Sequence, residues 1–145
     1  ISSDNKKLEK GNPDVFAWVK KKTDKDIYDA CQTFEYQTNS LTNSNQTPFV
    51  TITMTIPTSW ESERVILNYF KVRQGGLTDN KGHKTIAIFP KISMFVVDGQ
   101  NLKEGDKYYY ILKEASKCIA NTYYPDLLLY SKEDYENGTM YARMG

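Results

Sequence analysis

Two periodicities of hydrophobic residues divide the chain into helices and strands. Asn12-Pro13 is typical of a helix start, because Asn caps a helix and Pro fits its first turn. Apolar residues and a basic run follow, and Thr23–Asp26 then resembles a capping box with Asp in place of the usual Glu. A further apolar stripe recurs at four- and three-residue spacing, at Ile27, Cys31 and Phe34. The pattern predicts two successive helices, the second ending near Leu41, after a flexible polar leader over residues 1–11.

A period of two follows in TPFVTITMTIP, which predicts a strand between Pro48 and Pro57. Its apolar and hydroxyl side chains alternate, at Val50, Ile52, Met54 and Ile56 and at Thr51, Thr53 and Thr55. Two interpretations of the hydroxyl face stay open. It is either a solvent-exposed face, which the general habit of half-buried strands favours, or a polar face that lines an enclosed, hydrogen-bonding interior.

The rest of the chain repeats helix and strand. Ser59 is a good cap for a helix that ends at Gly75-Gly76. Residues 86–97 form a nearly continuous apolar run, typical of a strand buried on both faces, and Pro90 should break its hydrogen-bond ladder. Helical spacing returns over 108–121, and 127–130 is a short apolar strand. The order predicts an α/β fold with parallel strands and crossover helices. Three such strands would leave bare sheet edges, so the pattern also predicts further strands beside them.

Composition and charge exclude several classes of protein. The 145 residues are enough for one domain, and 39% of them are hydrophobic. A formal net charge of +1, with acidic and basic residues interleaved, gives no sign of nucleic-acid binding. The sequence has no apolar run long enough to span a membrane and no apolar core of a secretory signal. Cytoplasmic localisation is therefore expected.

Few side chains suggest chemistry by themselves. Cys31 and Cys118 are far apart in the sequence and are expected to be small buried hydrophobes, although a disulfide is possible in principle. With His83 as the one histidine, a metal site is not expected. Phosphate-loop, dinucleotide, serine-hydrolase and zinc-protease motifs are absent from the sequence. The 11 tyrosines are expected to pack in the core and at its rim rather than to stack on bases.

Five blocks in order carry a family resemblance: QTPFVTITM, SWESERVI, KTIAIFPK, ANTYYPDLL and the closing MG. With the preceding TDKDIYDACQTFEYQTNSL, they resemble the catalytic subunit of anaerobic (class III) ribonucleoside-triphosphate reductases, which are glycyl-radical enzymes. The resemblance covers residues 15–145. It implies a ten-stranded α/β barrel made of two parallel half-barrels, with a finger loop through the centre. Residues 12–145 would be a fragment of that catalytic domain, after the leader over residues 1–11.

The resemblance also implies a site. The family carries a Met-Gly-Cys-Arg motif on the finger loop, and its cysteine forms the thiyl radical that attacks the ribose. Met144 and Gly145 match the first two positions, so these are the catalytic residues carried over, and the cysteine would come next. Gly145 is not the radical glycine, and Cys118 matches a packing cysteine. A split gene or an intein would explain an interruption before that cysteine, whose thiol could serve in splicing.

The expected function follows from the same resemblance. The complete enzyme would reduce ribonucleoside triphosphates to deoxyribonucleoside triphosphates, while the fragment alone would be inactive. A glycyl radical, zinc and ATP/dNTP effectors would serve the complete enzyme, with no cofactor or metal site in these residues. Its partners would be the rest of the catalytic subunit, a radical-SAM activating enzyme and the nucleotide substrate, without membrane or nucleic acid. Alternatives are a self-standing α/β binding module and a tyrosine-rich nucleic-acid binder, which the net charge disfavours.

Overall fold

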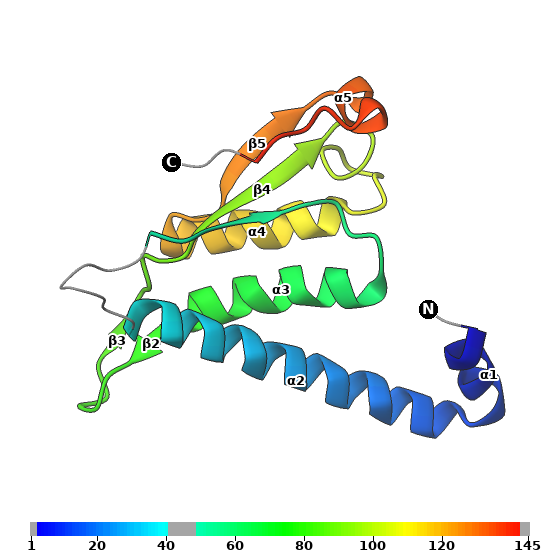
Figure 1. The fold of residues 1–145 in the computed structure, drawn as a ribbon, viewed down its shortest axis with the longest axis horizontal. Helices are drawn as coiled ribbons and strands as arrows, with labels where there is room; N and C mark the ends of the chain where they lie inside the picture. The colour runs from blue at the N-terminus through cyan, green and yellow to red at the C-terminus, as the bar shows by residue number, and fades with distance from the viewer. Residues whose placement is uncertain (1–2, 41–48, 143–145) are drawn as a thin grey trace.

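A three-stranded parallel sheet with helices on one side forms the centre of the protein (Figure 1). The computed structural model describes residues 3–40 and 49–142. The strands are β1 (Thr51–Met54), β4 (Lys91–Val97) and β5 (Asp126–Tyr130), in the spatial order β1-β4-β5. Both pairings are parallel. The predicted α/β class with parallel strands and crossover helices is confirmed.

The N-terminal helices differ from the prediction. Residues expected to be a loose leader form α1 (Ser3–Gly11), whose Lys and Glu residues favour a helix. The two helices predicted next are one continuous helix, α2 (Pro13–Ser40), and the prediction of a boundary at Thr23–Asp26 is wrong. The side chain of Asp26, which would close the capping box, pairs with Lys22 one turn earlier instead, and the Asp24 carboxylate accepts hydrogen bonds from two side chains of the next helix. Since the sequence has no Gly or Pro between residues 14 and 40, nothing interrupts the helix.

Two further helices cover the sheet, α3 (Trp60–Gly75) and α4 (Tyr109–Thr122). Ser59 caps α3 as predicted, and Gly76 ends it. With part of α2, these helices enclose the main core against β1 and β4. The buried members of this core are Cys31, Met54, Ile66, Leu67, Tyr69, Phe70, Val72, Ile92, Met94, Ile111, Ala115 and Cys118.

The central strand is shorter than the apolar run that predicts it. Pro90 has no backbone N–H, so β4 begins one residue later, at Lys91, and is buried over nearly all its length. Both the break at Pro90 and the burial on two faces are confirmed. A small antiparallel hairpin, β2 (Leu77–Thr78) and β3 (Lys84–Thr85), precedes it and was not predicted. The last helix, α5 (Lys132–Asn137), was not predicted either.

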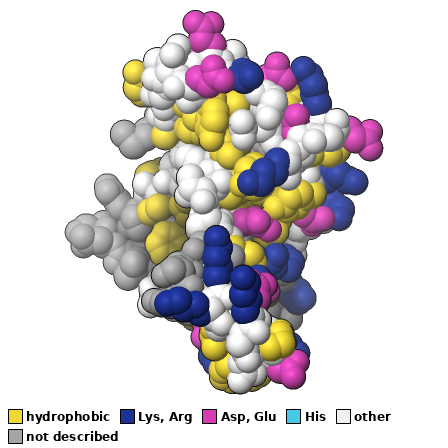
Figure 2. All heavy atoms as spheres, turned by 90° about the vertical axis from the view of Figure 1, so that its right-hand side faces the viewer, with side chains coloured by type: hydrophobic (Ala, Val, Ile, Leu, Met, Phe, Trp, Pro, Cys, Tyr) yellow, Lys and Arg dark blue, Asp and Glu magenta, His cyan; other side chains and the backbone are white. Residues whose placement is uncertain are grey.

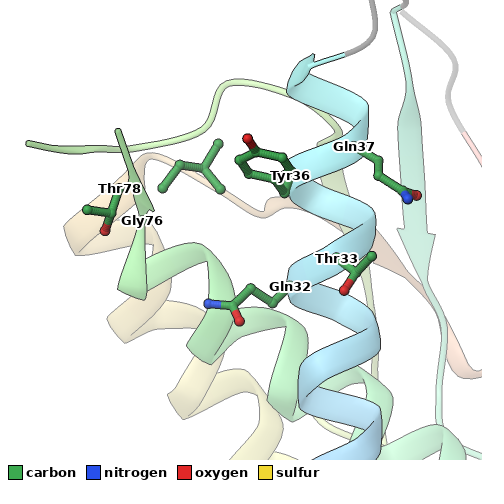
Figure 3. Close-up of a pocket in the computed structure, with 7 residues that line it drawn as sticks. Gln32, Thr33, Tyr36, Gln37, Gly76 and Thr78 are labelled. Carbon is green, nitrogen blue, oxygen red and sulfur yellow. The ribbon is translucent and has the colours of Figure 1, made fainter. Parts of the chain in front are cut away.

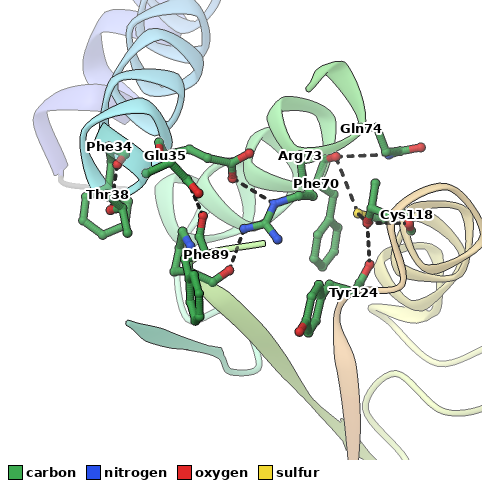
Figure 4. A network of polar contacts seen from close by, with 12 residues as sticks. Phe34, Glu35, Thr38, Phe70, Arg73, Gln74, Phe89, Cys118 and Tyr124 are labelled. Atoms are coloured by element: carbon green, nitrogen blue, oxygen red, sulfur yellow. Dashed lines mark hydrogen bonds and ion pairs between the residues drawn. The ribbon is translucent and has the colours of Figure 1, made fainter. Parts of the chain in front are cut away.

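A buried polar network joins α2 to α3 (Figure 4). Arg73 donates through Nε to Oε2 of Glu35 at 3.0 Å and through Nη2 to the carbonyl oxygen of Pro90 at 2.6 Å. Burial raises the pKa of the Glu35 carboxyl, and the Arg73 charge opposes this rise. On the other side of α3, the Cys118 thiol lies 3.7 Å from the carbonyl oxygen of Phe70. The network fixes the end of α3 against both of its neighbours.

Candidate functional site

The sheet has a second face, turned away from α2, α3 and α4. Side chains alternate between the two sides of a strand, and Ile52, Ile92 and Met94 contact the helical core. The residues between them therefore point to the other side, which we call the far face. Its members are Thr51, Thr53, Lys91, Ser93, Phe95, Val97, Asp126, Leu128 and Tyr130.

Three polar side chains cross the far face in one line. Thr53 of β1 is in register with Ser93 of β4, which is in register with Asp126 of β5. The hydroxyl oxygens of Thr53 and Ser93 are 3.0 Å apart, within hydrogen-bond distance. Ser93 is 5% exposed, whereas Asp126 is exposed. We call Thr53, Ser93 and Asp126 the polar row. It places two hydroxyls and one carboxylate side by side across the three strands.

The other half of the far face is apolar. Phe95 and Tyr130 pack edge to face with their ring centres 5.0 Å apart, and Ile56 and Val97 are buried with them. Asn101 fixes the end of β4 from the following loop. Its side chain accepts a hydrogen bond from the Val97 N–H at 2.8 Å and donates to the Phe95 carbonyl oxygen at 3.0 Å. We call this apolar half of the far face the platform.

The chain folds back over that platform after β5. Residues 131–142, which we call the return segment, include α5 and then run beside β5 in the opposite direction (Figure 1). Gly138 ends α5 in the left-handed conformation, with φ 66°. Met140 packs on the apolar cluster, and the Tyr130 hydroxyl donates to the carbonyl oxygen of Tyr141 at 2.6 Å. The predicted site residues Met144 and Gly145 lie outside the described residues.

The two cysteines are free, and both are buried as predicted. Burial raises the pKa of the Cys31 thiol to about 11, and it also raises the pKa of Cys118. A thiol with a raised pKa stays protonated near neutral pH, so neither cysteine offers a thiolate. Within residues 3–40 and 49–142, no group of three or more His, Cys, Asp or Glu side chains is placed to hold a metal ion.

A hollow of about 470 Å³ lies between α2 and the β2–β3 hairpin (Figure 3). Its polar groups do not converge, because Gln32 and Gln37 point to opposite sides of α2. The Thr33 hydroxyl donates to the carbonyl oxygen of Asp29 instead of facing the hollow freely. The residues that line it carry no charge. It is therefore a weaker candidate than the far face.

A second hollow, of about 340 Å³, lies between α2 and β1. Its lining is almost wholly apolar and includes Cys31, Phe34 and Met54. Such a surface buries apolar groups but offers nothing to orient a polar substrate.

Charges are mixed over the side of the molecule that Figure 2 presents. Basic and acidic side chains lie close to one another on it, with apolar patches between them. This agrees with the interleaved charges of the sequence and its formal net charge of +1. None of the helices in the described parts of the chain is long and apolar enough to cross a membrane.

Comparison with known proteins identifies the family. A family model described as anaerobic ribonucleoside-triphosphate reductase matches residues 8–145. Reductases of that name from Salmonella typhimurium and Escherichia coli are each 39% identical over 134 residues, which are 92% of this chain and 18% of the relative. The one from Enterobacteria phage T4 is 42% identical over 117 residues, 79% of this chain and 19% of the relative. The chain belongs to the anaerobic ribonucleoside-triphosphate reductase family, and it spans about a fifth of the length of these relatives.

Sequence reasoning identified the family but missed most of the structural site. It singled out the hydroxyl face of β1, including Thr53, and left its environment open. It gave no role to Ser93 or Asp126, because nothing local marks a serine in an apolar run or an aspartate after a proline. The register of three strands brings them together. Alternate residues of a strand lie on the same side of the sheet. Assigning a side to the residues of all three strands is the step that would have found Ser93 and Asp126.

Proposed function

We propose that this chain forms part of the catalytic barrel of an anaerobic ribonucleoside-triphosphate reductase, with the far face turned toward the bound nucleotide. The complete protein would reduce ribonucleoside triphosphates to deoxyribonucleoside triphosphates by radical chemistry. Family membership supports the reaction class. The chain's own contribution to it is a wall of the site and the segment that leads to Met144 and Gly145.

The architecture supports a place in a barrel. Helices α3 and α4 follow parallel strands and pack on one side of the sheet only, as the outer helices of an α/β barrel do. Within the described residues, β1 and β5 each pair with a strand on one edge alone. In the proposed ten-stranded barrel, other strands of the complete subunit would pair with these two edges, and the far face would line the interior.

The polar row is the observation that carries the proposal. A ribose presents hydroxyl groups that both donate and accept hydrogen bonds. Thr53 and Ser93 offer hydroxyls of the same kind, and Asp126 offers a strong acceptor. The row lies on the face that the return segment crosses, so substrate-binding groups and the segment before Met144 and Gly145 would share one cavity.

The expected cofactors belong to other parts of the complete subunit in this proposal. Zinc is usually held by cysteine and histidine ligands, and here both cysteines are core residues with raised pKa values. The described residues therefore do not fit a zinc site. The glycyl radical, the zinc, the ATP/dNTP effector sites and the contact with a radical-SAM activating enzyme are all assigned to residues beyond this chain.

An anaerobic turnover assay tests the proposal. The intact protein that contains this chain is incubated with an activating enzyme of the radical-SAM class, a reductant and each ribonucleoside triphosphate. We expect deoxyribonucleoside triphosphates, and none when the activating enzyme is omitted. Failure of the activated protein to form any deoxyribonucleotide would overturn the proposal. A cooperative, monomeric thermal transition of the 145-residue chain alone, combined with that failure, would favour the self-standing binding module.

A further inference from the structure

Tyr130 joins the strand on which it lies to the chain that crosses the far face. We infer that it is a positioning residue of the reductase, which holds the peptide group of Tyr141 and so orients the chain that leads to Met144 and Gly145. This inference rests on the proposed function. It adds a role for a residue that neither the family resemblance nor the sequence motifs single out.

The contacts of Tyr130 fix it on both sides. Its ring packs edge to face on Phe95 of the central strand. Its carbonyl oxygen accepts a hydrogen bond from the Asp98 N–H at 3.2 Å, and its strand position is in register with Val97. The phenol is thus held by β4 before it meets the return segment. A donor with so little freedom specifies the position of its acceptor closely.

Among the described residues, the Tyr130 hydroxyl is the polar group that holds the last part of the return segment. The hydrogen bonds of α5 and its cap end at Thr139, whose N–H donates to the Asp134 carbonyl oxygen at 3.0 Å. Met140 then packs on the apolar cluster through its side chain. The side chain of Tyr141 is 73% exposed, so its own packing contributes little. The Tyr130 hydrogen bond, at 2.6 Å, therefore orients the peptide that follows Met140.

The short distance along the chain makes this attachment matter. Gly145 is four residues beyond Tyr141 (145 − 141), a span of at most about 14 Å when fully extended. A shift of the Tyr141 peptide changes the region that Gly145 can reach over so short a span. Misplacement of reacting groups by about 1 Å is enough to lower a catalytic rate about a hundredfold.

The test compares two tyrosines of the same apolar cluster in the intact protein. Tyr130→Phe keeps the ring and removes the hydroxyl. Tyr135→Phe is the matched control, because Tyr135 also packs on the cluster and its hydroxyl makes no hydrogen bond to the described residues. Two readouts are needed: the steady-state constants of nucleotide reduction, and hydrogen exchange of the peptide that covers residues 138–145.

Tyr130→Phe should lower kcat about fivefold, with the KM for the ribonucleoside triphosphate unchanged, which corresponds to the loss of one hydrogen bond. The peptide over 138–145 should exchange faster by a similar factor, while peptides of α3 and α4 keep their rates. Tyr135→Phe should resemble the wild type in both readouts. A purely structural role would lower the melting temperature and leave kcat per folded enzyme unchanged.

The outcomes separate this inference from the function on which it rests. An active enzyme whose kcat and exchange rates do not change in Tyr130→Phe overturns the positioning role alone. Equal effects of Tyr130→Phe and Tyr135→Phe overturn it as well. An inactive wild-type protein overturns the proposed function and the role in catalysis together. The exchange rates would then still decide whether Tyr130 holds the return segment.

Discussion

Arg73 and Glu35 form an ion pair whose two side chains are completely buried, with 3.0 Å between Nε and Oε2. They come from α3 and α2, 38 positions apart in the sequence. Arg73 Nη1, Glu35 Oε1 and the Tyr69 hydroxyl have no further hydrogen-bond partner among the described residues. The pair therefore joins α2 to α3 at one defined point. Each of its two buried charges is compensated by the other.

Breaking this pair on one side should be costly. Arg73→Met leaves the Glu35 carboxylate buried without its counter-charge, and we expect the free energy of unfolding to fall by about 3–5 kcal/mol. The double variant Glu35→Leu/Arg73→Met should recover most of the loss, because it removes both charges. Urea unfolding of the intact protein measures both. Lys25→Met, which removes an exposed pair with Asp29, is the control and should have little effect. Equal losses in Arg73→Met and Lys25→Met would contradict the role of burial.

The contribution of Asp24 to the stability of the α2–α3 contact should depend on pH. Its hydrogen bond from Arg64, together with the one from Asn68, holds the pKa of Asp24 below its usual value of 3.8. Because the pKa of Asp24 is lower in the folded than in the unfolded protein, ionised Asp24 stabilises the fold at pH values above its unfolded pKa. This contribution is lost as the pH falls through the folded pKa. Asp24→Asn should therefore be less stable than the wild type at pH about 7, and the difference should shrink below pH about 4. Urea unfolding across this pH range measures the difference in the free energy of unfolding between Asp24→Asn and the wild type. Asp26→Asn, which removes an exposed pair with Lys22, is the control and should have little effect on stability.

Gly76 should resist substitution more than the other glycines with positive φ. Its φ is +69°, and a Cβ atom there would lie 2.8 Å from the carbonyl oxygen of Thr85. Gly76→Ala is expected to lower the free energy of unfolding by more than the about 1 kcal/mol that a positive φ alone costs. Gly82→Ala has a φ of +81° and open space around the added methyl, so it isolates the conformational cost. Thermal unfolding of both variants measures the two losses of stability and compares them. A loss for Gly76→Ala no larger than that for Gly82→Ala would show that the backbone contact is relieved.

Local signals explain which parts of the fold the sequence predicts. The cap at Ser59, the stop at Gly76 and the break at Pro90 depend on residues within one turn of the chain, and each is found where expected. The division of α2 is wrong for a different reason. A capping pattern competes with other partners within a continuous helix, and Asp26 pairs with Lys22 instead. The capping box of α5 was passed over because Ser131 precedes a helix of only six residues, too short for an apolar stripe.

The candidate site depends on contacts that no local pattern contains. The sequence left open whether the hydroxyl face of β1 is exposed or enclosed. In the structure Thr51 is exposed, while Thr53 is partly buried against Ser93. This pairing joins positions 40 apart, and it arises from strand register, which the sequence does not specify. Family resemblance reached Met144 and Gly145, and their catalytic role stays a prediction.

The central claim is that the far face meets the nucleotide, and Ser93 tests it most directly. The measurement is kcat/KM of the intact protein for ribonucleoside triphosphate reduction under anaerobic conditions, in Ser93→Ala and in Ser116→Ala. Ser116 is the matched control, because its hydroxyl lies on the exposed side of α4 and donates to the carbonyl oxygen of Leu112. We predict that Ser93→Ala lowers kcat/KM about tenfold, the cost of about one hydrogen bond to substrate, and that Ser116→Ala leaves it unchanged. A value of kcat/KM in Ser93→Ala equal to that of the wild type would contradict the claim.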